Sequence, residues 1–352
     1  MAVNEAKLQE FMGKALGDIG AGMSAVLVLI GDKLGLYKAL AQSGPATPAE
    51  LAQRTGCAER YLREWLANQA AGGYVAYDAA TKKYRLLEEQ AMALADETSP
   101  AFIPGIFHVM SAVFKDEPKI TERFRSGQGL GWGEHDKSLF EGTERFFRPY
   151  YNANLVSSWI PALDGVEAKL KKGAKVADVG CGFGASTILM AKAFPKSEFL
   201  GFDAHGPSID AARKRAQEAG VGERVKFEVA KSTDYPGKDY DFVAHFDCLH
   251  DMGDPVGAAR HVFETLKKEG SWMIAEPFAH DQVEENLNPI GRLFYAISTM
   301  ICVPASLAYN GPALGAQAGE ACLRDIINKG GFKKIRRATQ TPFNLVLEAK
   351  AG

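Results

Sequence analysis

The sequence contains the stretch Val176-Ala177-Asp178-Val179-Gly180-Cys181-Gly182-Phe183-Gly184. An apolar run typical of a strand leads into three closely spaced glycines, and an apolar helical segment, 185–194, follows directly. Glycines allow positive φ angles and let a ligand approach the backbone closely. A helix that begins there presents free N–H groups to an anionic or polar ligand. The stretch therefore predicts a ligand-binding turn at the carboxyl end of a strand.

Strands and helices alternate in the sequence that follows this stretch. The predicted strands are 175–180, 198–203, 225–229, 240–246, 271–276, 332–338 and 343–349. The predicted helices are 185–194, 208–219, 255–266 and 320–329. Such alternation is typical of a sheet with helices on both faces. We therefore predict an α/β fold with a doubly wound, mostly parallel, seven-stranded sheet.

The first 90 residues are mostly helical and end in a hairpin. Thr47 followed by Pro48 and Glu50 predicts a short helix with a capping box, which should end at Gly56. A second helix and two short strands are predicted at 58–70, 74–77 and 83–86. The order helix, helix, hairpin is that of a winged helix.

An apolar helical face precedes the capping box. It consists of Val26, Leu27, Ile30, Leu34, Leu36, Tyr37 and Leu40. A small winged helix is too small to cover this face, so we expect a homodimer with twofold symmetry, built through the N-terminal region.

The remaining chain divides by pattern into two parts. Residues 91–170 are expected to form a helical connector that covers the site, with breaks at Pro104, Pro118 and 126–133. Residues 171–352 are expected to form the ligand-binding domain, with an apolar insert at about 281–318. The three predicted regions are therefore 1–90, 91–170 and 171–352.

The composition excludes several classes of protein. The chain has 352 residues and a net charge of −2, which gives no basic surface for nucleic acid. Its five cysteines include no Cys-x-x-Cys pair, so neither a disulfide framework nor a zinc site is predicted. The N-terminal residues lack the pattern of an export signal, and no apolar run is suited to span a membrane. We expect a cytoplasmic protein that binds neither nucleic acid nor membrane.

Two acidic residues suggest which ligand the glycine turn binds. Asp203 ends the second predicted strand, where a carboxylate can accept both hydroxyls of a ribose. Gly180, Gly182 and Ala185 also satisfy the dinucleotide pattern, so the glycines alone leave two cofactors open. Asp178, however, precedes the turn, where its charge would repel a pyrophosphate and could instead hold an ammonium group. This favours a nucleoside ligand with a cationic part.

The segment Asp178–Gly184 with Asp203 resembles the first motif and the ribose-binding acid of class I S-adenosylmethionine-dependent methyltransferases. The segment 246–255, with Leu249-His250-Asp251, resembles one found in winged-helix O-methyltransferases of bacteria and plants. The resemblance extends from Thr47 onward. It implies the strand order 3-2-1-4-5-7-6 with strand 7 antiparallel, S-adenosylmethionine as the cofactor, and a small, hydrophobic molecule as the methyl acceptor.

The cofactor contacts implied by the resemblance lie at or just after the carboxyl ends of the first four strands. They are Asp178, Gly180, Cys181, Gly182, Gly184, Asp203, Ala204, Ser232, Phe246 and Asp247. One position departs from the family pattern, because Lys231 stands where many relatives have an acid that contacts adenine. A lysine cannot accept the adenine N6 hydrogens, so Ser232, the backbone or Asp234 would have to replace it.

The chemistry is predicted to depend on one histidine and one glutamate. His250 follows the fourth strand at the carboxyl edge of the sheet, where open α/β folds bind ligands, and it suits a general base. Glu276 ends the neighbouring strand and could orient the imidazole. The other histidines lack metal-ligand spacing, and turns or caps explain Asp247, Asp251 and Asp254, so we predict no metal.

Two other functions remain open from the sequence. A winged helix can bind DNA, so a regulator that senses a nucleotide-like ligand is one alternative. Residues 45–86 contain six basic and four acidic side chains, too small an excess for much phosphate contact. An NAD(P)-dependent oxidoreductase is the other alternative, because of the glycine pattern.

Overall fold

The computed structural model describes residues 3–352, which form two compact units. The first unit joins the residues up to 112 with 141–149, and the second joins 113–140 with 150–352. Two long helices therefore contribute residues to both units. These helices are α6 (Pro104–Ser126) and α7 (Ser138–Asn154).

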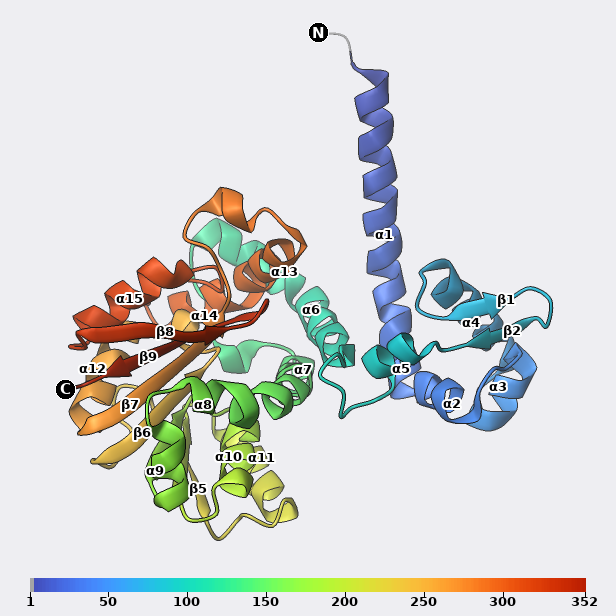
Figure 1. Cartoon of the computed structure of the whole chain (residues 1–352). Coiled ribbons are helices and arrows are strands. Elements are labelled where there is room, and N and C mark those ends of the chain that lie inside the picture. The colour runs from blue at the N-terminus through green and yellow to red at the C-terminus, as the bar shows by residue number, and fades with distance from the viewer. Residues whose placement is uncertain (1–2) are drawn as a thin grey trace. The chain divides into compact units, whose positions relative to one another are not determined.

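The first unit contains helices α1 to α5 and one hairpin (Figure 1). Their bounds are α1 Glu5–Lys33, α2 Leu36–Ser43, α3 Pro48–Thr55, α4 Glu59–Ala71, β1 Ala76–Asp78, β2 Lys83–Arg85 and α5 Glu88–Leu94. The predicted capping box is present. The Thr47 hydroxyl accepts the Glu50 N–H at 3.2 Å, and the Glu50 carboxylate accepts the Thr47 N–H at 2.7 Å. Leu62, Trp65 and Leu66 of α4 are buried in the core of this unit.

The prediction that one apolar helical face runs from Val26 to Leu40 is wrong in two respects. The chain forms two helices there, because Gly35 adopts a left-handed conformation with φ of 67° after α1 has ended. Val28 and Leu29 are buried, whereas Val26 and Ile30 lie on the exposed side. The contacts of Trp65 decide this orientation: its indole N–H donates to the Leu27 carbonyl and its ring packs against Gly31.

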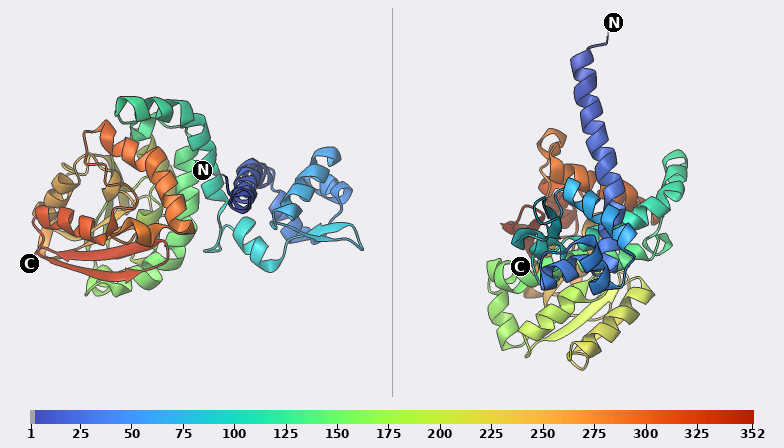
Figure 2. Two further views of the ribbon diagram at one scale, coloured as in Figure 1. Left: turned by 90° about the horizontal axis from the view of Figure 1, so that it is seen from above. Right: turned by 90° about the vertical axis from the view of Figure 1, so that its right-hand side faces the viewer.

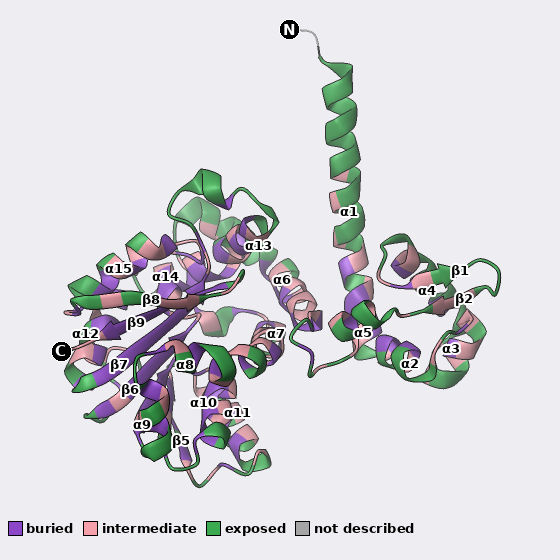
Figure 3. Ribbon diagram, viewed as in Figure 1, coloured by how far each residue is buried: buried purple, intermediate pink, exposed green. Residues whose placement is uncertain are grey.

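Residues 5–14 of α1 are all exposed, and most residues from there to Ser24 are exposed as well (Figure 3). Helix α1 and the run Pro289–Ala308 are each long and apolar enough to meet the length and hydropathy of a membrane span. Core helices of soluble proteins share this composition, and in an apolar stretch of 18 residues 44% of the second segment is buried, against 22% for the first. Helix α1 is therefore the less buried of these two apolar segments.

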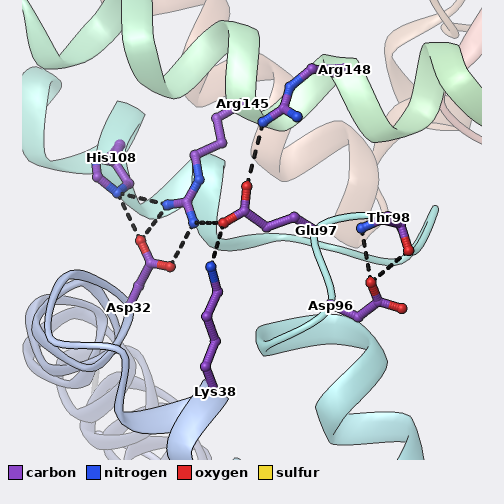
Figure 4. Close-up of polar contacts among 8 residues, drawn as sticks. All are labelled: Asp32, Lys38, Asp96, Glu97, Thr98, His108, Arg145 and Arg148. Carbon is purple, nitrogen blue, oxygen red and sulfur yellow. Dashed lines mark hydrogen bonds and ion pairs between the residues drawn. The ribbon is translucent and has the colours of Figure 1, made fainter. Parts of the chain in front are cut away.

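A network of charged side chains attaches the α7 segment 141–149 to the first unit (Figure 4). The Arg145 guanidinium donates to both oxygens of Asp32, and to Glu97 at 3.2 Å. His108 contacts the same Asp32 carboxylate at 3.0 Å. Burial alone would raise the pKa of Asp32, but hydrogen bonds from His108 and Arg145 lower it to about 2. Asp32 is therefore ionised, and it ties α1, α6 and α7 together within this unit.

The second unit is built on a seven-stranded sheet with helices on both faces (Figures 1 and 2). The strands are β3 Lys175–Val179, β4 Glu198–Asp203, β5 Val225–Val229, β6 Tyr240–Phe246, β7 Leu266–Pro277, β8 Lys334–Gln340 and β9 Asn344–Lys350. Their order is β5-β4-β3-β6-β7-β9-β8, with β9 antiparallel to both neighbours. This order confirms the predicted fold class and the strand order implied by the resemblance.

The helices of this unit close both faces of the sheet. The main helices are α8 Ile160–Ala162, α9 Val166–Lys172, α10 Ala185–Ala193, α11 Gly206–Glu218, α12 Pro255–Thr265, α13 Pro289–Ile297, α14 Val303–Ala308 and α15 Gly319–Lys329. Short 3₁₀ or π turns are η1 Trp132–Glu134, η2 Leu155–Trp159, η3 Leu249–Asp251, η4 Val283–Asn286 and η5 Ser298–Cys302. One core cluster lies between the sheet and helices α12 and α15.

Two predicted boundaries are wrong. Pro118 does not break the connector, because α6 continues through it to Ser126. Proline removes the hydrogen bond to the carbonyl four residues earlier, and since Phe114 and Pro118 are exposed, water can satisfy that carbonyl. Strand β7 begins at Leu266, five residues before the predicted start at Ser271.

Candidate active site

The glycine turn lies between β3 and α10 at the carboxyl edge of the sheet. Gly180, Gly182 and Gly184 have φ angles of 75°, 51° and 78°, which side chains other than glycine rarely adopt. A Cβ on Gly180 would lie 2.7 Å from the Cys248 sulfur. The turn therefore requires glycine both for its backbone angles and for its close packing.

Asp203 holds this turn in place from the end of β4. Its carboxylate accepts the Gly182 N–H at 2.9 Å and the His205 N–H at 2.8 Å. Burial raises the pKa of Asp203, and these two hydrogen bonds limit the rise. Because each carboxylate oxygen accepts more than one hydrogen bond, Asp203 can brace the turn and still accept hydroxyl groups of a ligand.

Asp178 lies fully buried in β3, just before the turn. One of its oxygens accepts hydrogen bonds from the Ser186 and Thr187 hydroxyls, both at 2.6 Å. Its other oxygen, Oδ1, is buried and has no partner within residues 3–352. Burial raises the pKa of Asp178 to about 6, although the two hydroxyls oppose the rise. A buried, unpartnered carboxylate oxygen fits a ligand that brings an N–H donor or a positive charge.

His250 and Glu276 lie together, as their positions in the sequence predict. The imidazole Nδ1 of His250 contacts one oxygen of Glu276, whose other oxygen accepts the Leu249 N–H at 2.8 Å. Both side chains are buried. Burial disfavours the imidazolium, but the Glu276 charge and the nearby Cys302 thiol outweigh it and raise the pKa of His250 well above its usual value. The Glu276 charge therefore favours the protonated form of the His250 imidazole.

Phe246 and Asp247 continue from β6 into this region. Asp247 has a φ of 50°, and its carboxylate accepts the Tyr151 hydroxyl at 2.9 Å and the Asn344 amide at 2.7 Å. Burial and the Glu276 charge raise the pKa of Asp247 to about 7. The structure thus engages both Asp247 oxygens within the protein, so this residue fixes the loop between β6 and His250.

The other predicted cofactor residues lie on the same edge of the sheet. Cys181 is buried in the glycine turn, Ala204 is exposed after β4, and Ser232 is partly buried after β5. The Ala230 N–H donates to the Asp203 carbonyl at 3.0 Å, which places the Ser232 loop beside Asp203. Lys231 is exposed, and its backbone N–H donates to Asp234 at 3.2 Å.

Sequence reasoning missed an aromatic cluster beside Asp203. The ring of Phe140 stacks on His205, with centroids 4.8 Å apart, and Trp132 packs against Phe140 at 5.6 Å. These rings come from the connector, which the sequence predicted only in general terms as a cover. In the sequence these residues are visible only as aromatic residues of the connector. No local pattern predicts which of their rings faces His205.

Two further groups near His250 were also missed or assigned differently. Cys302, from η5 in the apolar insert, is the thiol that faces His250. Asp251 directly follows His250 in the chain. Burial, together with the Glu276 and Asp203 charges, raises the pKa of Asp251 to about 7, although the His250 charge opposes this rise. Asp254 caps α12 by accepting the Gly257 N–H at 2.7 Å. Within residues 3–352, no three His, Cys, Asp or Glu side chains are grouped to hold a metal ion.

Two protein families match separate parts of the chain. Residues 22–96 match a family described as the Rv2258c-like winged helix-turn-helix domain, and residues 170–310 match a methyltransferase domain family. Among curated relatives, an uncharacterized methyltransferase of Bacillus subtilis, YcgJ, is 28% identical over 123 residues, or 34% of this chain and 47% of that protein. The chain thus spans about half or less of the length of the first curated relatives that it matches.

Solved structures match almost the whole chain. Mitomycin 7-O-methyltransferase has a TM-score of 0.70 at 18% identity and covers 98% of this chain and all of its own. Human N-acetylserotonin methyltransferase, solved with S-adenosylmethionine, has a TM-score of 0.69 at 17% identity, with both chains fully covered. At these identities the likeness establishes the fold. The chain thus carries a winged-helix domain and a methyltransferase domain, and its sheet order is the one that the resemblance to class I S-adenosylmethionine-dependent methyltransferases implied.

Proposed function

We propose that this protein transfers a methyl group from S-adenosylmethionine to an oxygen atom of a small, mostly hydrophobic molecule, with His250 as general base. The observation that carries the proposal is the arrangement of Asp178 and Asp203 around the glycine turn, next to the His250–Glu276 pair. All four side chains lie at the carboxyl ends of β3, β4, β6 and β7, which are adjacent in the sheet. Ligands of open α/β sheets bind at this edge.

The residues present suit the proposed cofactor. Asp203 offers carboxylate oxygens to ribose hydroxyls, and the unpartnered Asp178 oxygen can accept from an ammonium group directly or through water. The glycine turn lets the nucleoside approach the backbone, with Cys181, Ala204, Ser232 and Phe246 along the same edge. When bound, S-adenosylmethionine supplies a methyl carbon that is activated by a positive sulfur. The protein therefore has mainly to align the acceptor and exclude water.

His250 would remove the proton from the acceptor hydroxyl. Glu276 holds Nδ1, which leaves Nε2 as the nitrogen that can accept this proton. Since the pKa of His250 is raised, the ligand-free imidazole must first lose its own proton. Activity should therefore increase with pH through that raised pKa. Glu276 stabilises the imidazolium that forms as the acceptor hydroxyl is deprotonated.

Calorimetric titration with S-adenosylhomocysteine tests the cofactor. We expect micromolar binding, on the order of −8 kcal/mol. Tight binding of NADH, with no response to S-adenosylhomocysteine, would overturn the proposal in favour of an oxidoreductase. Screening a cell extract for transfer of a labelled methyl group would then identify the acceptor.

The same proposal includes a homodimer formed through α1. The exposed apolar residues of α1 follow the alternating spacing of four and three residues that is typical of a helix packed on another helix. They are Met12, Leu16, Ile19, Met23, Val26 and Ile30. Light scattering should give the mass of a dimer for the intact chain and of a monomer for the double variant Leu16→Glu, Met23→Glu. A Lys7→Glu variant, which changes charge off this face, should remain dimeric.

The winged helix is proposed to serve this assembly and not DNA. The arginines of α4, Arg60 and Arg63, form ion pairs with Glu64 and Glu59 at 2.6 and 2.8 Å. Arginines neutralised in this way add little to phosphate binding. We also propose a cytoplasmic location, which suits the five free cysteines. Sequence-specific DNA binding at physiological salt would instead support a regulator.

A further inference from the structure

A groove adjoins the candidate active site at the end of β7. Its volume is about 430 Å³, within the range of ~300–1,000 Å³ that is usual for small-ligand sites. One wall begins at Phe278, two residues after Glu276, and another is formed by the turn between β8 and β9. A residue of the groove, Phe278, is therefore two positions along the chain from Glu276, which contacts His250.

The opposite wall is also connected to His250. The Gly315 N–H donates to the His250 carbonyl at 3.3 Å, and Ala316 packs against the buried Cys302. Gln317, the next residue, lines the groove. Phe278 is two residues after Glu276, and Gln317 is two residues after Gly315, which contacts His250, so a molecule reacting beside His250 could extend into the groove.

Gln317 has an unusual hydrogen-bonding state in this groove. Its amide N–H donates to the Ala316 carbonyl at 3.0 Å, which fixes the orientation of the side chain. Its carbonyl oxygen, Oε1, is buried and has no partner within residues 3–352. A buried oxygen without a donor carries a free-energy cost that a ligand with an O–H or N–H group would remove.

The remaining lining is neutral. Phe278 and Ile290 provide apolar surface, Gln340 and Thr341 provide uncharged polar groups, and His280 is the one titratable side chain among the lining residues. The Thr341 hydroxyl is already engaged by Tyr150 and by the Asn344 N–H. A carboxylate or an ammonium ion would find no opposite full charge in this lining, so a neutral ligand is favoured.

We infer that this groove binds the non-reacting part of a neutral acceptor molecule, and that Gln317 accepts a hydrogen bond from a hydroxyl or amide N–H on that molecule. The identity of the ligand as the acceptor rests on the proposed function. The binding preference of the groove rests on its own lining. Gln317 is therefore a specificity-determining residue, and Phe278 offers the apolar surface against which a ring can pack.

Four probes of similar shape test this inference on the full chain: benzamide, benzyl alcohol, benzoate and benzylammonium. Saturation-transfer NMR should show that benzamide and benzyl alcohol bind, and that benzoate binds at least fivefold more weakly. Gln317→Leu should weaken benzamide binding by about tenfold, because the hydrogen bond is lost while size is kept. Gln282→Leu, at an exposed glutamine outside the groove, should leave binding unchanged.

A second variant keeps the test decisive if Gln317→Leu disturbs folding. Gln317→Glu retains the oxygen and adds a charge, so benzylammonium should become the preferred probe. Equal binding of benzamide and benzoate, or unchanged benzamide binding in Gln317→Leu, would overturn the inference. Titration with S-adenosylhomocysteine separates the two proposals: cofactor binding without this probe preference rejects the groove alone, whereas probe preference without cofactor binding rejects the proposed function alone.

Discussion

Replacing Glu276 by glutamine should change the protonation of His250 in a defined way. Glu276 accepts the Leu249 N–H with one oxygen and contacts His250 Nδ1 with the other. Glutamine has a single oxygen. If it keeps the bond to Leu249, its NH₂ group faces His250 and donates to Nδ1. The imidazole then becomes neutral with its proton on Nε2, the nitrogen proposed to accept the proton of the acceptor.

The direction of the pKa change follows from its causes. Burial opposes the imidazolium, and the Glu276 charge is the main influence that overcomes it. Without that charge only the Cys302 thiol still opposes burial, so the pKa of His250 should fall well below its value in the wild type. The ion pair stabilises the wild-type fold fully below the unfolded pKa of histidine, and this contribution is lost as pH rises through the raised pKa. Exchange of this charge-assisted hydrogen bond for a neutral one should lower the free energy of unfolding by about 1 kcal/mol.

Nitrogen-15 NMR of the histidine rings measures this without any acceptor. The chain has seven histidines, and a His250→Gln variant assigns the signal. In the wild type, His250 should remain an imidazolium at pH 7. In Glu276→Gln it should be neutral at pH 7, with the proton on Nε2. Once an acceptor is known, methyl transfer should fall by roughly 10²–10⁴-fold, since the base nitrogen is blocked.

Two results would refute this reasoning. A neutral His250 at pH 6 in the wild type would show that the Glu276 charge does not overcome burial. An imidazolium that persists at pH 7 in Glu276→Gln would show that another group sets the charge. Glu264→Gln, at an exposed glutamate near the C-terminal end of α12, serves as the matched control and should leave the His250 signal unchanged.

Three further changes test the cap and the two acids. Thr47→Ala removes the capping bond to the Glu50 N–H, so chemical denaturation should show a loss of about 1 kcal/mol, and no loss would contradict the cap. Asp203→Ala, which also frees the Gly182 N–H, should weaken S-adenosylhomocysteine binding by about 1–3 kcal/mol in calorimetry; unchanged affinity would exclude Asp203 as a ligand. Asp178 has a pKa of about 6, above its unfolded value, so its ionisation destabilises the fold as pH rises through that range. Asp178→Asn should therefore gain about 1.4 kcal/mol of unfolding free energy relative to wild type between pH 5 and pH 8; a constant difference would show that Asp178 does not titrate there.

The sequence predicts the second unit well because its signals are local. Three glycines with positive φ, the alternation of apolar runs and the acids at strand ends each act within a few residues. Strands β4, β5 and β6 match their predicted bounds. The proximity of His250 and Glu276 also follows, because adjacent parallel strands bring their carboxyl ends together.

The errors arise where distant contacts decide the outcome. A face of α1 was predicted from helical spacing alone, but Trp65 selects which side of the helix is buried, and Gly35 ends the run. Cys302 reaches His250 from an insert about 50 residues later in the chain, and no spacing rule predicts that contact. Phe140 meets His205 in the same way. Such pairs depend on how the connector and insert pack on the sheet.

The placement of unpartnered oxygens connects the two proposed sites. Among residues 3–352, six buried side-chain polar atoms lack a partner, and only two of these are oxygens, Asp178 Oδ1 and Gln317 Oε1. Asp178 borders the glycine turn, and Gln317 lines the groove beside the His250–Glu276 pair. Buried oxygens without donors reduce stability, and they persist where a bound molecule supplies the donor. One oxygen demands a donor from the cofactor and the other from the acceptor, so filling both sites should stabilise the protein more than filling either site alone.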